Sequence, residues 1–584
     1  MSDRNISTAA ESTPVAAADL MEDFDHKFRA AIIAACGGFS PFSVYRAWLD
    51  WGVHLAASPG RGLALRVGAL DAVARGAAAL VDLKGRATAS QAAADKRFRD
   101  EAWRRWPYSA WAENFLTWEN WWDKATQGVH GADPHNLALV NFLARQALDA
   151  MAPTNFLQTN PVALEETLKQ RGANLTRGLN YFWRDVASVL QGRRSPEALA
   201  WVPGKSVALT PGAVVRRTKL AEIIQYSPTT EKVRPEPVVI APAWIMKYYI
   251  LDLQPRDSLI KALTEAGFTV FAISWRNPTA ENRDLGFESY ATEGLAPAIE
   301  AALAITGASR VHLAGYCIGG ALAAVTAAAM ARDHDGRLAS LTMLAAQVDY
   351  TEAGELTLFV DPSQVAAIDD MMWKPGVFEG ARMAGAFDLL RSNDLIWSHI
   401  IHHYLMGRPE TMTDIAAWSQ DTTRLPAAMQ LEYLREFYLN NDFAEGRLVF
   451  GGKPTSPRDI RVPVFALGTE TDHVAPWKSV FKVHQFTDAE VTFALTSGGH
   501  NTGVVSPPGT PGRSYHLATA SPAAVRPTPE DWLASSKKCE GSWWPAWFDW
   551  LAARSGEPVS PPPLGKPEAG LPALEPAPGQ YVRG

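Results

Sequence analysis

The stretch VHLAGYCIGG, residues 311–320, joins an apolar run to a segment rich in alanine. The apolar run has the length of a buried strand, and the alanine-rich segment after it favours a helix. Glycines stand two residues before and two residues after Cys317, at Gly315 and Gly319. A sharp turn from strand to helix tolerates only small side chains at those two positions. The pattern therefore predicts that Cys317 lies at the tip of such a turn.

A cysteine at this place is suited to act as a nucleophile. The N-terminus of the following helix presents free amides and the positive end of the helix dipole, both of which stabilise a thiolate. The amide of Ile318 would also donate a hydrogen bond to an oxyanion formed on the substrate. The alternative is a buried structural cysteine in a glycine-flanked turn, and partners elsewhere in the chain decide between the two.

Candidate partners follow two later apolar runs. Val464–Leu467 is followed by GTETDH, residues 468–473, and Val491–Leu495 leads to SGGHN, residues 497–501. When a cysteine or serine nucleophile lies at such a turn, the acid and then the histidine follow later strands. The same order in this chain favours a nucleophile over a structural cysteine.

This order predicts that Asp472 and His500 complete a catalytic triad with Cys317. His500 would accept the thiol proton, and Asp472 would orient the ring and stabilise the imidazolium. Glu470 remains an alternative for the acid, and His473 for the base. We expect His473 to lie next to the triad residues and to help position them, without accepting the thiol proton itself.

Short apolar runs alternate with helix-length segments after about residue 205. The runs predicted to be strands are Val238–Ala241, Val270–Trp275, Val311–Ala314, Leu341–Ala346, Val464–Leu467 and Val491–Leu495. Amphipathic stretches such as 257–266 and 289–306 lie between them. This alternation predicts an α/β protein with a mainly parallel, doubly wound sheet. Together with the turn at Cys317, it indicates the α/β-hydrolase fold.

The remaining parts of the chain differ from this region in composition and in the secondary structure that their pattern predicts. Residues 1–20 are small and polar and are expected to be disordered, whereas 21–205 predict a helical N-terminal domain. The catalytic domain would span 206–555 and carry a large lid insertion at about 350–460, where no strand pattern occurs. Residues 556–584 are rich in proline and glycine and predict an extended or mobile tail.

The composition argues against several classes of protein. The chain has 584 residues, a net charge of −7 and no basic stripe, which argues against nucleic-acid binding. Three cysteines do not suffice for a disulfide framework or a cysteine-based zinc site. The sequence shows neither a signal peptide nor an apolar run long enough to span a bilayer, so we expect a cytoplasmic protein without a transmembrane segment. His402 and His403 are adjacent and point to different sides of a helix, so we expect no metal site, and no cofactor is indicated.

Motifs across most of the chain resemble those of polyhydroxyalkanoate synthases, of the class I type that acts as a single kind of subunit. The resemblance runs from about residue 45 to 555. Besides the turn at Cys317, the motifs are DKRFRDEAW (95–103), PTNFLQTNP (153–161), WIMKYYILDL (244–253), SWRNP (274–278), DHVAPW (472–477), GGH (498–500) and SPP (506–508). Met246, Ser398 and Ser419 depart from the family pattern, which has asparagine there.

The resemblance implies polymerisation of (R)-3-hydroxyacyl-CoA, chiefly (R)-3-hydroxybutyryl-CoA, into polyester with release of coenzyme A. It assigns the triad to Cys317, Asp472 and His500. It places the second oxyanion amide in the loop at Ala243–Trp244, on Trp244. It also implies a homodimer in the cytoplasm, associated with the surface of polyester granules.

Two other functions remain open from the sequence. One is a hydrolase with a cysteine nucleophile, such as a thioesterase or a dienelactone-hydrolase-like enzyme, although such an enzyme does not need the helical half or the lid. The other is a non-catalytic scaffold on granules, which has no reason to retain all three triad residues. Trp543, Trp547 and Trp550 share one helix face, and we expect them to pack on the core rather than to hold polymer.

Overall fold

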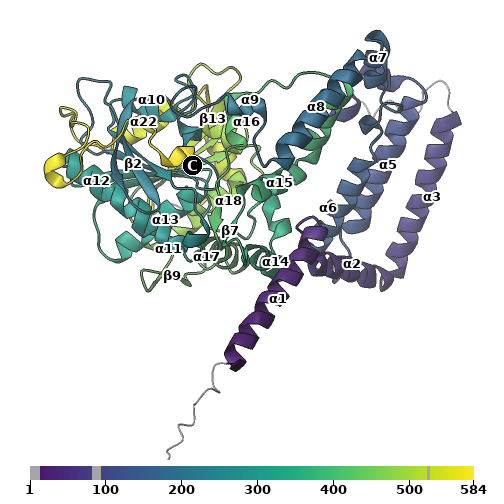
Figure 1. Ribbon diagram of the computed structural model, residues 1–584, viewed down its shortest axis with the longest axis horizontal. Helices are drawn as coiled ribbons and strands as arrows, with labels where there is room; N and C mark the ends of the chain where they lie inside the picture. Colours follow the sequence, from purple (N-terminus) through teal and green to yellow (C-terminus); the bar gives the residue numbers. More distant parts are fainter. Residues whose placement is uncertain (1–12, 82–93, 523–525) are drawn as a thin grey trace, which may run out of the picture. The chain divides into compact units, whose positions relative to one another are not determined.

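Figure 1 shows the computed structural model, which describes residues 13–81, 94–522 and 526–584. The chain forms two compact units. The first comprises Met1–Gly38, Glu197–Met383 and Thr413–Gly584, and the second comprises Phe39–Pro196 and Ala384–Met412. The middle of the segment expected to form the lid therefore belongs to the second, helical unit, while its two flanks belong to the first.

A ten-stranded sheet forms the centre of the first unit, in the order β1-β2-β4-β3-β5-β6-β11-β12-β13-β14. The strands are β1 Gly212–Arg217, β2 Ala221–Tyr226, β3 Val238–Ala241, β4 Val270–Trp275, β5 Val311–Tyr316, β6 Leu338–Leu344, β11 Val464–Thr469, β12 Val491–Thr496, β13 Ser514–Ala520 and β14 Lys537–Glu540. Neighbours from β4 to β12 pair in parallel, and antiparallel strands flank them on both sides. The predicted mainly parallel sheet of the α/β-hydrolase fold is confirmed.

The pairing register aligns the ends of the strands that carry the predicted site. Tyr316 of β5 lies opposite Leu344 of β6, and Leu344 lies opposite Leu467 of β11. Thr469, at the end of β11, pairs with Thr496, at the end of β12. Because parallel strands all end at one edge, the turns after β5, β11 and β12 come together there.

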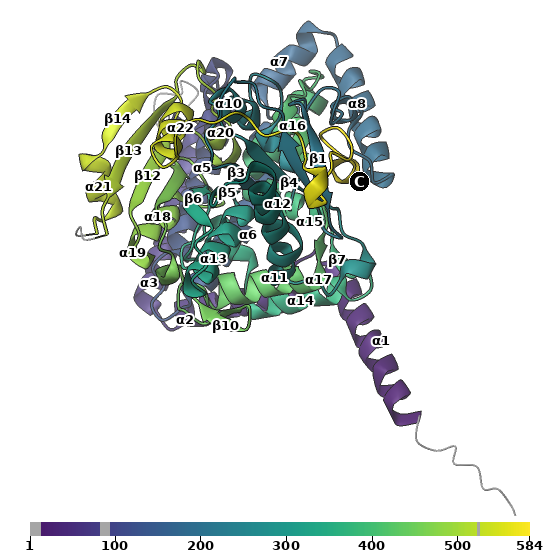
Figure 2. The same ribbon diagram turned by 90° about the vertical axis from the view of Figure 1, so that its left-hand side faces the viewer.

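Helices cover both faces of this sheet (Figures 1 and 2). Helices α10 (Leu259–Glu265) and α22 (Trp544–Ala552) lie on one side, and α12 (Ala296–Thr306) and α13 (Ile318–Arg332) lie on the other. The tryptophans of α22 belong to the core, as predicted. Trp547 is fully buried, and its indole N–H donates to Thr342 Oγ1 of β6 at 3.0 Å.

Shorter elements complete the first unit. Its other helices are α1 Thr13–Ala35, α9 Pro196–Leu199, α11 Phe287–Tyr290, α14 Pro362–Met372, α15 Gly380–Leu390, α16 Asp414–Ser419, α17 Ala427–Glu432, α18 Trp477–Phe481, α19 Val483–Phe486, α20 His500–Val504 and α21 Pro529–Ser535, of which α9 and α15 continue into the second unit. Strands β7 (Val377–Phe378) and β8 (Leu425–Pro426) form one small ribbon, and β9 (Leu448–Phe450) and β10 (Lys453–Thr455) form another.

The N-terminal end differs from what the sequence led us to expect, whereas the C-terminal tail adopts the first of the two states expected for it, extended or mobile. Residues 1–12 lie outside the described residues, but α1 begins at Thr13, inside the stretch expected to be disordered. The proline-rich tail is extended and fastened to the sheet edge. The amides of Gln580 and Tyr581 both donate to the buried Glu222 carboxylate at 2.9 Å, and Leu574 N donates to Val214 O of β1 at 2.8 Å. The tail is therefore held in place rather than mobile.

The described residues of the second unit form helices and no strand. The helices are α2 Pro41–Ala56, α3 Pro59–Val81, α5 Tyr108–Thr126, α6 Pro134–Ala150, α7 Pro161–Lys169 and α8 Ala173–Leu190, with the π-helical segments η8 Asn393–Trp397 and η9 Ile400–Leu405. Asp133 and Asn160 cap α6 and α7, each of which has proline in its first turn. Among the described helices of both units, none is long and apolar enough to span a membrane.

A largely buried arginine pairs with three carboxylates in the second unit. Arg97, from the DKRFRDEAW motif, pairs with Asp95 at 2.7 Å, Glu119 at 2.8 Å and Asp149 at 3.2 Å. The side chains of Glu119 and Asp149 are only 5% and 4% exposed. Burial raises the pKa of Asp149, and the Arg97 charge opposes that rise. Without Arg97, Arg145, which pairs with Glu119 at 3.3 Å, would be the cation left beside these three carboxylates.

We expect Arg97→Met to destabilise the second unit by about 3–5 kcal/mol, the usual cost of leaving a buried charge without its partner. The change should accelerate hydrogen exchange of the amides in α5 and α6, which carry Glu119 and Asp149, more than in the sheet. Arg99→Met, at an exposed position two residues later, is the matched control. Equal exchange rates in both variants would contradict this role of Arg97.

Candidate active site

Cys317 occupies a strained turn between β5 and α13. Its backbone has φ 55° and ψ −127°, a conformation that residues with a side chain rarely adopt. The Cys317 amide donates to Leu344 O at 3.0 Å, and its carbonyl accepts from Gly320 N at 2.9 Å. These bonds hold the turn from the neighbouring strand and from the helix. The thiol itself is only partly buried.

The flanking glycines permit this turn because backbone atoms occupy the space of their missing side chains. A Cβ on Gly315 would overlap the carbonyl of Gly319, and a Cβ on Gly319 would overlap the carbonyls of Ala241 and Pro242. Gly319 thereby lets the loop that follows β3 approach the start of α13. This explains in physical terms the spacing seen in the sequence.

Asp472 and His500 lie together at the same edge of the sheet. His500 Nδ1 is 2.8 Å from Asp472 Oδ2, and Thr469 Oγ1 donates to that oxygen at 3.0 Å. The other carboxylate oxygen accepts from the amides of Val474 and Ala475 at 2.8 and 2.9 Å. Burial would raise the pKa of Asp472, but His500 and these two amides lower it below its ordinary value. The carboxylate is therefore ionised and fixed in orientation.

The structure also brings His500 to Cys317. Burial lowers the pKa of His500, but the charge of Asp472, the charge of Cys317 and hydrogen bonds to both raise it well above its ordinary value. Since Nδ1 faces Asp472, Nε2 is the ring atom left for the Cys317 sulfur. The three side chains thus form one line along which a proton can pass from sulfur to nitrogen.

The two residues that the sequence left as alternatives, Glu470 for the acid and His473 for the base, do not take part in the Asp472–His500 pair. Glu470 is exposed, one residue beyond the end of β11. His473 is half-buried, and its main-chain carbonyl accepts a hydrogen bond from Glu355 N at 3.1 Å. The geometry at His500 therefore favours Asp472 as the acid.

The two expected oxyanion donors lie at the start of α13 and in the loop after β3. Ile318 is the first residue of α13, where an amide has no acceptor within its own helix. The ring of Trp244 is buried and stacked on Tyr290 with centroids 4.3 Å apart. Thr423 fastens the loop, because its hydroxyl donates to Trp244 O and its amide donates to Ile245 O.

Three tyrosines near Cys317 were not expected from the sequence. The hydroxyls of Tyr350 and Tyr433 are 3.1 Å apart, and the rings of Tyr350 and Tyr438 are in contact at 4.9 Å. Burial raises the pKa of all three, and the Cys317 charge raises it further. Tyr350 precedes the other two by more than eighty residues, and no spacing pattern connects it to them.

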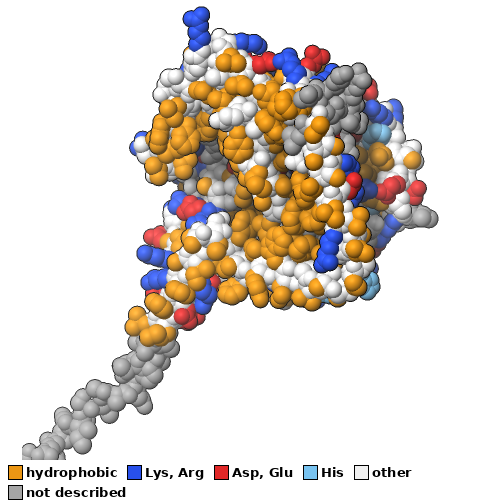
Figure 3. Space-filling model, turned by 90° about the vertical axis from the view of Figure 1, so that its right-hand side faces the viewer, with side chains coloured by type: hydrophobic (Ala, Val, Ile, Leu, Met, Phe, Trp, Pro, Cys, Tyr) orange, Lys and Arg blue, Asp and Glu red, His pale blue; other side chains and the backbone are white. Residues whose placement is uncertain are grey.

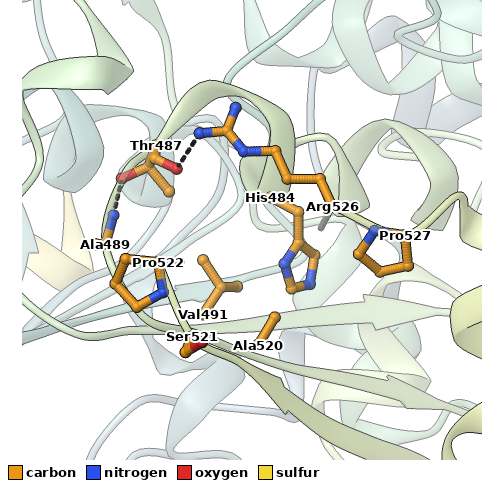
Figure 4. A pocket seen from close by; sticks show the side chains of 9 residues that line it. All are labelled: His484, Thr487, Ala489, Val491, Ala520, Ser521, Pro522, Arg526 and Pro527. Carbon is orange, nitrogen blue, oxygen red and sulfur yellow. Dashed lines mark hydrogen bonds between the residues drawn. The ribbon is translucent and has the colours of Figure 1, made fainter. Parts of the chain in front are cut away.

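A small pocket in the first unit lies away from this site (Figure 4). His484, Val491 and Arg526 are among the residues that line it. Burial and the nearby Arg526 lower the pKa of His484 to about 4. Val491 begins β12, whereas His500 follows the other end of that strand. The pocket is therefore not part of the triad.

We expect Asp472→Asn to slow alkylation of Cys317 by iodoacetamide at neutral pH by about tenfold or more. Asparagine does not stabilise the imidazolium, so the pKa of His500 falls and the proton stays on sulfur; each pKa unit corresponds to a tenfold change. The rate is measured by mass spectrometry of the peptide that contains Cys317. Glu470→Gln removes the exposed carboxylate nearby and should leave the rate unchanged. An equal loss in both variants would contradict the assignment of Asp472.

Comparison with known proteins identifies sequence families over most of the chain. Residues 236–507 match the alpha/beta hydrolase fold family. Residues 94–263 match the family described as the poly-beta-hydroxybutyrate polymerase (PhaC) N-terminus, and residues 20–61 match a second poly-beta-hydroxybutyrate polymerase N-terminal family.

Individual relatives match over most of both chains. The poly(3-hydroxyalkanoate) polymerase of Methylorubrum extorquens is 44% identical over 493 residues, which cover 84% of this chain and 80% of that protein. The poly(3-hydroxyalkanoate) polymerase subunit PhaC of Rhizobium etli is 38% identical over 84% of this chain and 76% of that protein. The corresponding subunit of Cupriavidus necator is 33% identical over 94% of this chain and 96% of that protein. The chain therefore belongs to the poly(3-hydroxyalkanoate) polymerase family.

Proposed function

We propose that this protein polymerises (R)-3-hydroxyacyl-CoA into polyester and carries the growing acyl chain as a thioester on Cys317. The observation that carries the proposal is the hydrogen bond between Asp472 and His500 at 2.8 Å, with the His500 ring close to Cys317 at a strained turn. Membership of the polymerase family supports the choice of substrate and product.

Acylation would begin with transfer of the Cys317 proton to His500 Nε2. The thiolate sulfur then forms a bond to the thioester carbonyl carbon, and the oxyanion is held by the amides of Ile318 and Trp244. As the carbonyl re-forms, the bond to the coenzyme A sulfur breaks. The leaving coenzyme A thiolate takes the proton from His500, while Asp472 stabilises the imidazolium throughout.

Elongation would use the same histidine on a different proton. His500 accepts the proton of a 3-hydroxyl group while that oxygen attacks an acyl thioester carbonyl, which forms an ester bond and releases a thiolate. Exchange between two thioesters is nearly isoenergetic. The chain can therefore wait on the Cys317 sulfur without falling into the deeper energy minimum of an oxygen ester.

We extend the proposal to short substrates, chiefly (R)-3-hydroxybutyryl-CoA, and to a class I enzyme with a single kind of subunit. Large rings lie near the nucleophile, since Tyr350 and Tyr433 are both close enough for the Cys317 charge to affect them, and Phe437 packs on both rings. Such crowding supports a short acyl chain over a long one. His473 would support the triad through the backbone of its loop.

We further propose a cytoplasmic homodimer that binds the surface of polyester granules. Exposed hydrophobic side chains on the second unit support a surface of this kind. On α3, Leu63, Val67, Leu70 and Val73 are each more than half exposed, and Phe42, Tyr45, Leu49 and Val53 form a similar exposed row on α2. Figure 3, which looks onto the right-hand side of Figure 1, shows hydrophobic side chains across much of that face.

The proposed activity is tested by incubating purified protein with (R)-3-hydroxybutyryl-CoA, measuring thiol release, and sorting the product into insoluble polymer and free acid. Release of coenzyme A with formation of polyester supports a polymerase. Release with free acid alone would indicate a hydrolase with a cysteine nucleophile instead. Binding of the substrate without turnover would indicate a scaffold.

We expect Cys317→Ala to abolish coenzyme A release without unfolding the protein, because no other group in the triad can form the thioester. Cys317→Ser should also be severely impaired, since a serine hydroxyl ionises far less readily than a thiol. Cys36→Ala and Cys539→Ala are the controls and should retain nearly full activity. Turnover by Cys317→Ala at a tenth of the wild-type rate or more would overturn the assignment.

A further inference from the structure

Two histidines and one carboxylate converge inside the second unit, between α8 and η9. His399 Nε2 and His403 Nε2 are each 3.8 Å from the same atom, Asp185 Oδ2. The three ligand atoms all lie within 4.8 Å of one another. The side chains of Asp185, His399 and His403 are 23%, 30% and 4% exposed. None of these residues belongs to the triad or to the loops around it.

The outer nitrogen of each histidine faces an oxygen. His403 Nδ1 is 2.8 Å from the carbonyl oxygen of Arg408, which can only accept, so Nδ1 carries a proton. In the neutral ring, His403 Nε2 therefore presents a lone pair. His399 Nδ1 lies 3.9 Å from Glu410 Oε1. Metal-binding histidines typically donate their outer N–H to a carbonyl or carboxylate, as His403 does to Arg408 O, whereas His399 is too far from Glu410 for a hydrogen bond.

The inner nitrogen of His403 lacks a hydrogen-bond partner. It is buried and 3.8 Å from Asp185, beyond the range of a hydrogen bond. A buried polar atom without a partner costs about 1–3 kcal/mol, so its presence requires a reason. The buried lone pair of His403 Nε2, with Asp185 Oδ2 and His399 Nε2 nearby, forms a site that a cation would satisfy.

The remaining neighbours of Asp185 are compatible with a cation. Tyr404 Oη donates to Asp185 Oδ2 at 2.9 Å and lies 3.3 Å from His399 Nε2, which is long for a hydrogen bond. Arg184 Nε lies 3.9 Å from the other oxygen, Asp185 Oδ1. The positive charge of Arg184 therefore lies next to the carboxylate oxygen that does not face the histidines.

The backbone around this cluster is tightly held. A side chain on Gly178 would overlap the carbonyl of Tyr404, so glycine lets α8 pack directly on the η9 backbone. The fully buried Asn174 donates from Nδ2 to Leu405 O at 2.8 Å. The ring of His403 stacks on Tyr181 with centroids 4.3 Å apart. The three ligands are therefore positioned by packed elements rather than by a loose surface.

We propose that Asp185, His399 and His403 bind a divalent cation of the zinc type that fastens η9 to α8. Tetrahedral zinc with bonds of about 2.0 Å separates its ligand atoms by about 3.3 Å, so the two 3.8 Å separations need to shorten by only about 0.5 Å. Nitrogen and oxygen ligands in this number suit zinc, with water completing the coordination. The site is structural and lies outside the polymerisation chemistry.

This proposal departs from the expectation that the chain has no metal site. That expectation considered the adjacent His402 and His403, which point apart. The pair that the fold brings together is His399 and His403, four residues apart on one side of the segment, and their rings lie 4.9 Å apart. The third ligand, Asp185, comes from a helix distant in sequence.

The test is zinc binding by the full-length protein in the Cys317→Ala background, which removes the catalytic thiol as a competing ligand. Protein treated with chelator is titrated with Zn²⁺ by calorimetry, and with Co²⁺ by visible absorption, which reports tetrahedral coordination. We expect one saturable equivalent, weakened at least tenfold by His399→Gln and by Asp185→Asn. Zinc should also slow hydrogen exchange in α8 and in residues 393–405.

His402→Gln is the matched control, because it removes an exposed histidine three residues from His399 and should leave the affinity within twofold. Retained helical circular dichroism in His399→Gln would separate loss of the ligand from loss of the fold. Absence of saturable zinc binding in the Cys317→Ala protein would overturn the proposal. Equal affinity in the His399→Gln and His402→Gln proteins would also overturn it.

Discussion

The backbone conformation of Cys317 is the constraint on which the site depends. A non-glycine residue at φ 55° is unfavourable unless its surroundings hold it, and here the β6 backbone and the first turn of α13 do so. The same turn brings the loop after β3 against α13, because Gly319 leaves room for the carbonyls of Ala241 and Pro242. One local constraint thus partly exposes the sulfur and brings the loop after β3 against the first turn of α13.

The charge states of the residues in the site depend on the burial and the hydrogen bonds of each side chain. Hydrogen bonds from two main-chain amides and from Thr469 help to keep Asp472 ionised. Burial lowers the pKa of His500, but the negative charge of Asp472 raises that pKa by more. The tyrosines around Cys317 exclude water, yet remain protonated because burial raises their pKa. His500 is the directed side-chain partner for a charge formed on sulfur. This arrangement suits a thiolate that must repeatedly accept and release an acyl chain.

Much of the first unit could be predicted because its inner strands are buried on both faces. Val464–Thr469 and Val491–Thr496 read as continuous apolar runs, and the polar residues that follow them mark the edge of the sheet. Four strands of this sheet, β1, β2, β13 and β14, were missed. Of these, β1 and β14 lie at the edges and carry charged residues, such as Arg216 and Lys537. The tyrosines near Cys317 and the Asp185–His399–His403 cluster depend on contacts between distant segments, which local patterns do not encode. For the same reason the sequence did not reveal that residues 384–412 join the helical unit.

The most direct test of the account is whether the growing chain is attached to Cys317. Protein incubated briefly with (R)-3-hydroxybutyryl-CoA would be quenched in acid, digested, and mapped by mass spectrometry. The account predicts adducts of one or more 3-hydroxybutyryl units on the peptide containing Cys317, removed by hydroxylamine as thioesters are. Polymer formation with adducts on a different residue, or with no covalent adduct at all, would contradict it.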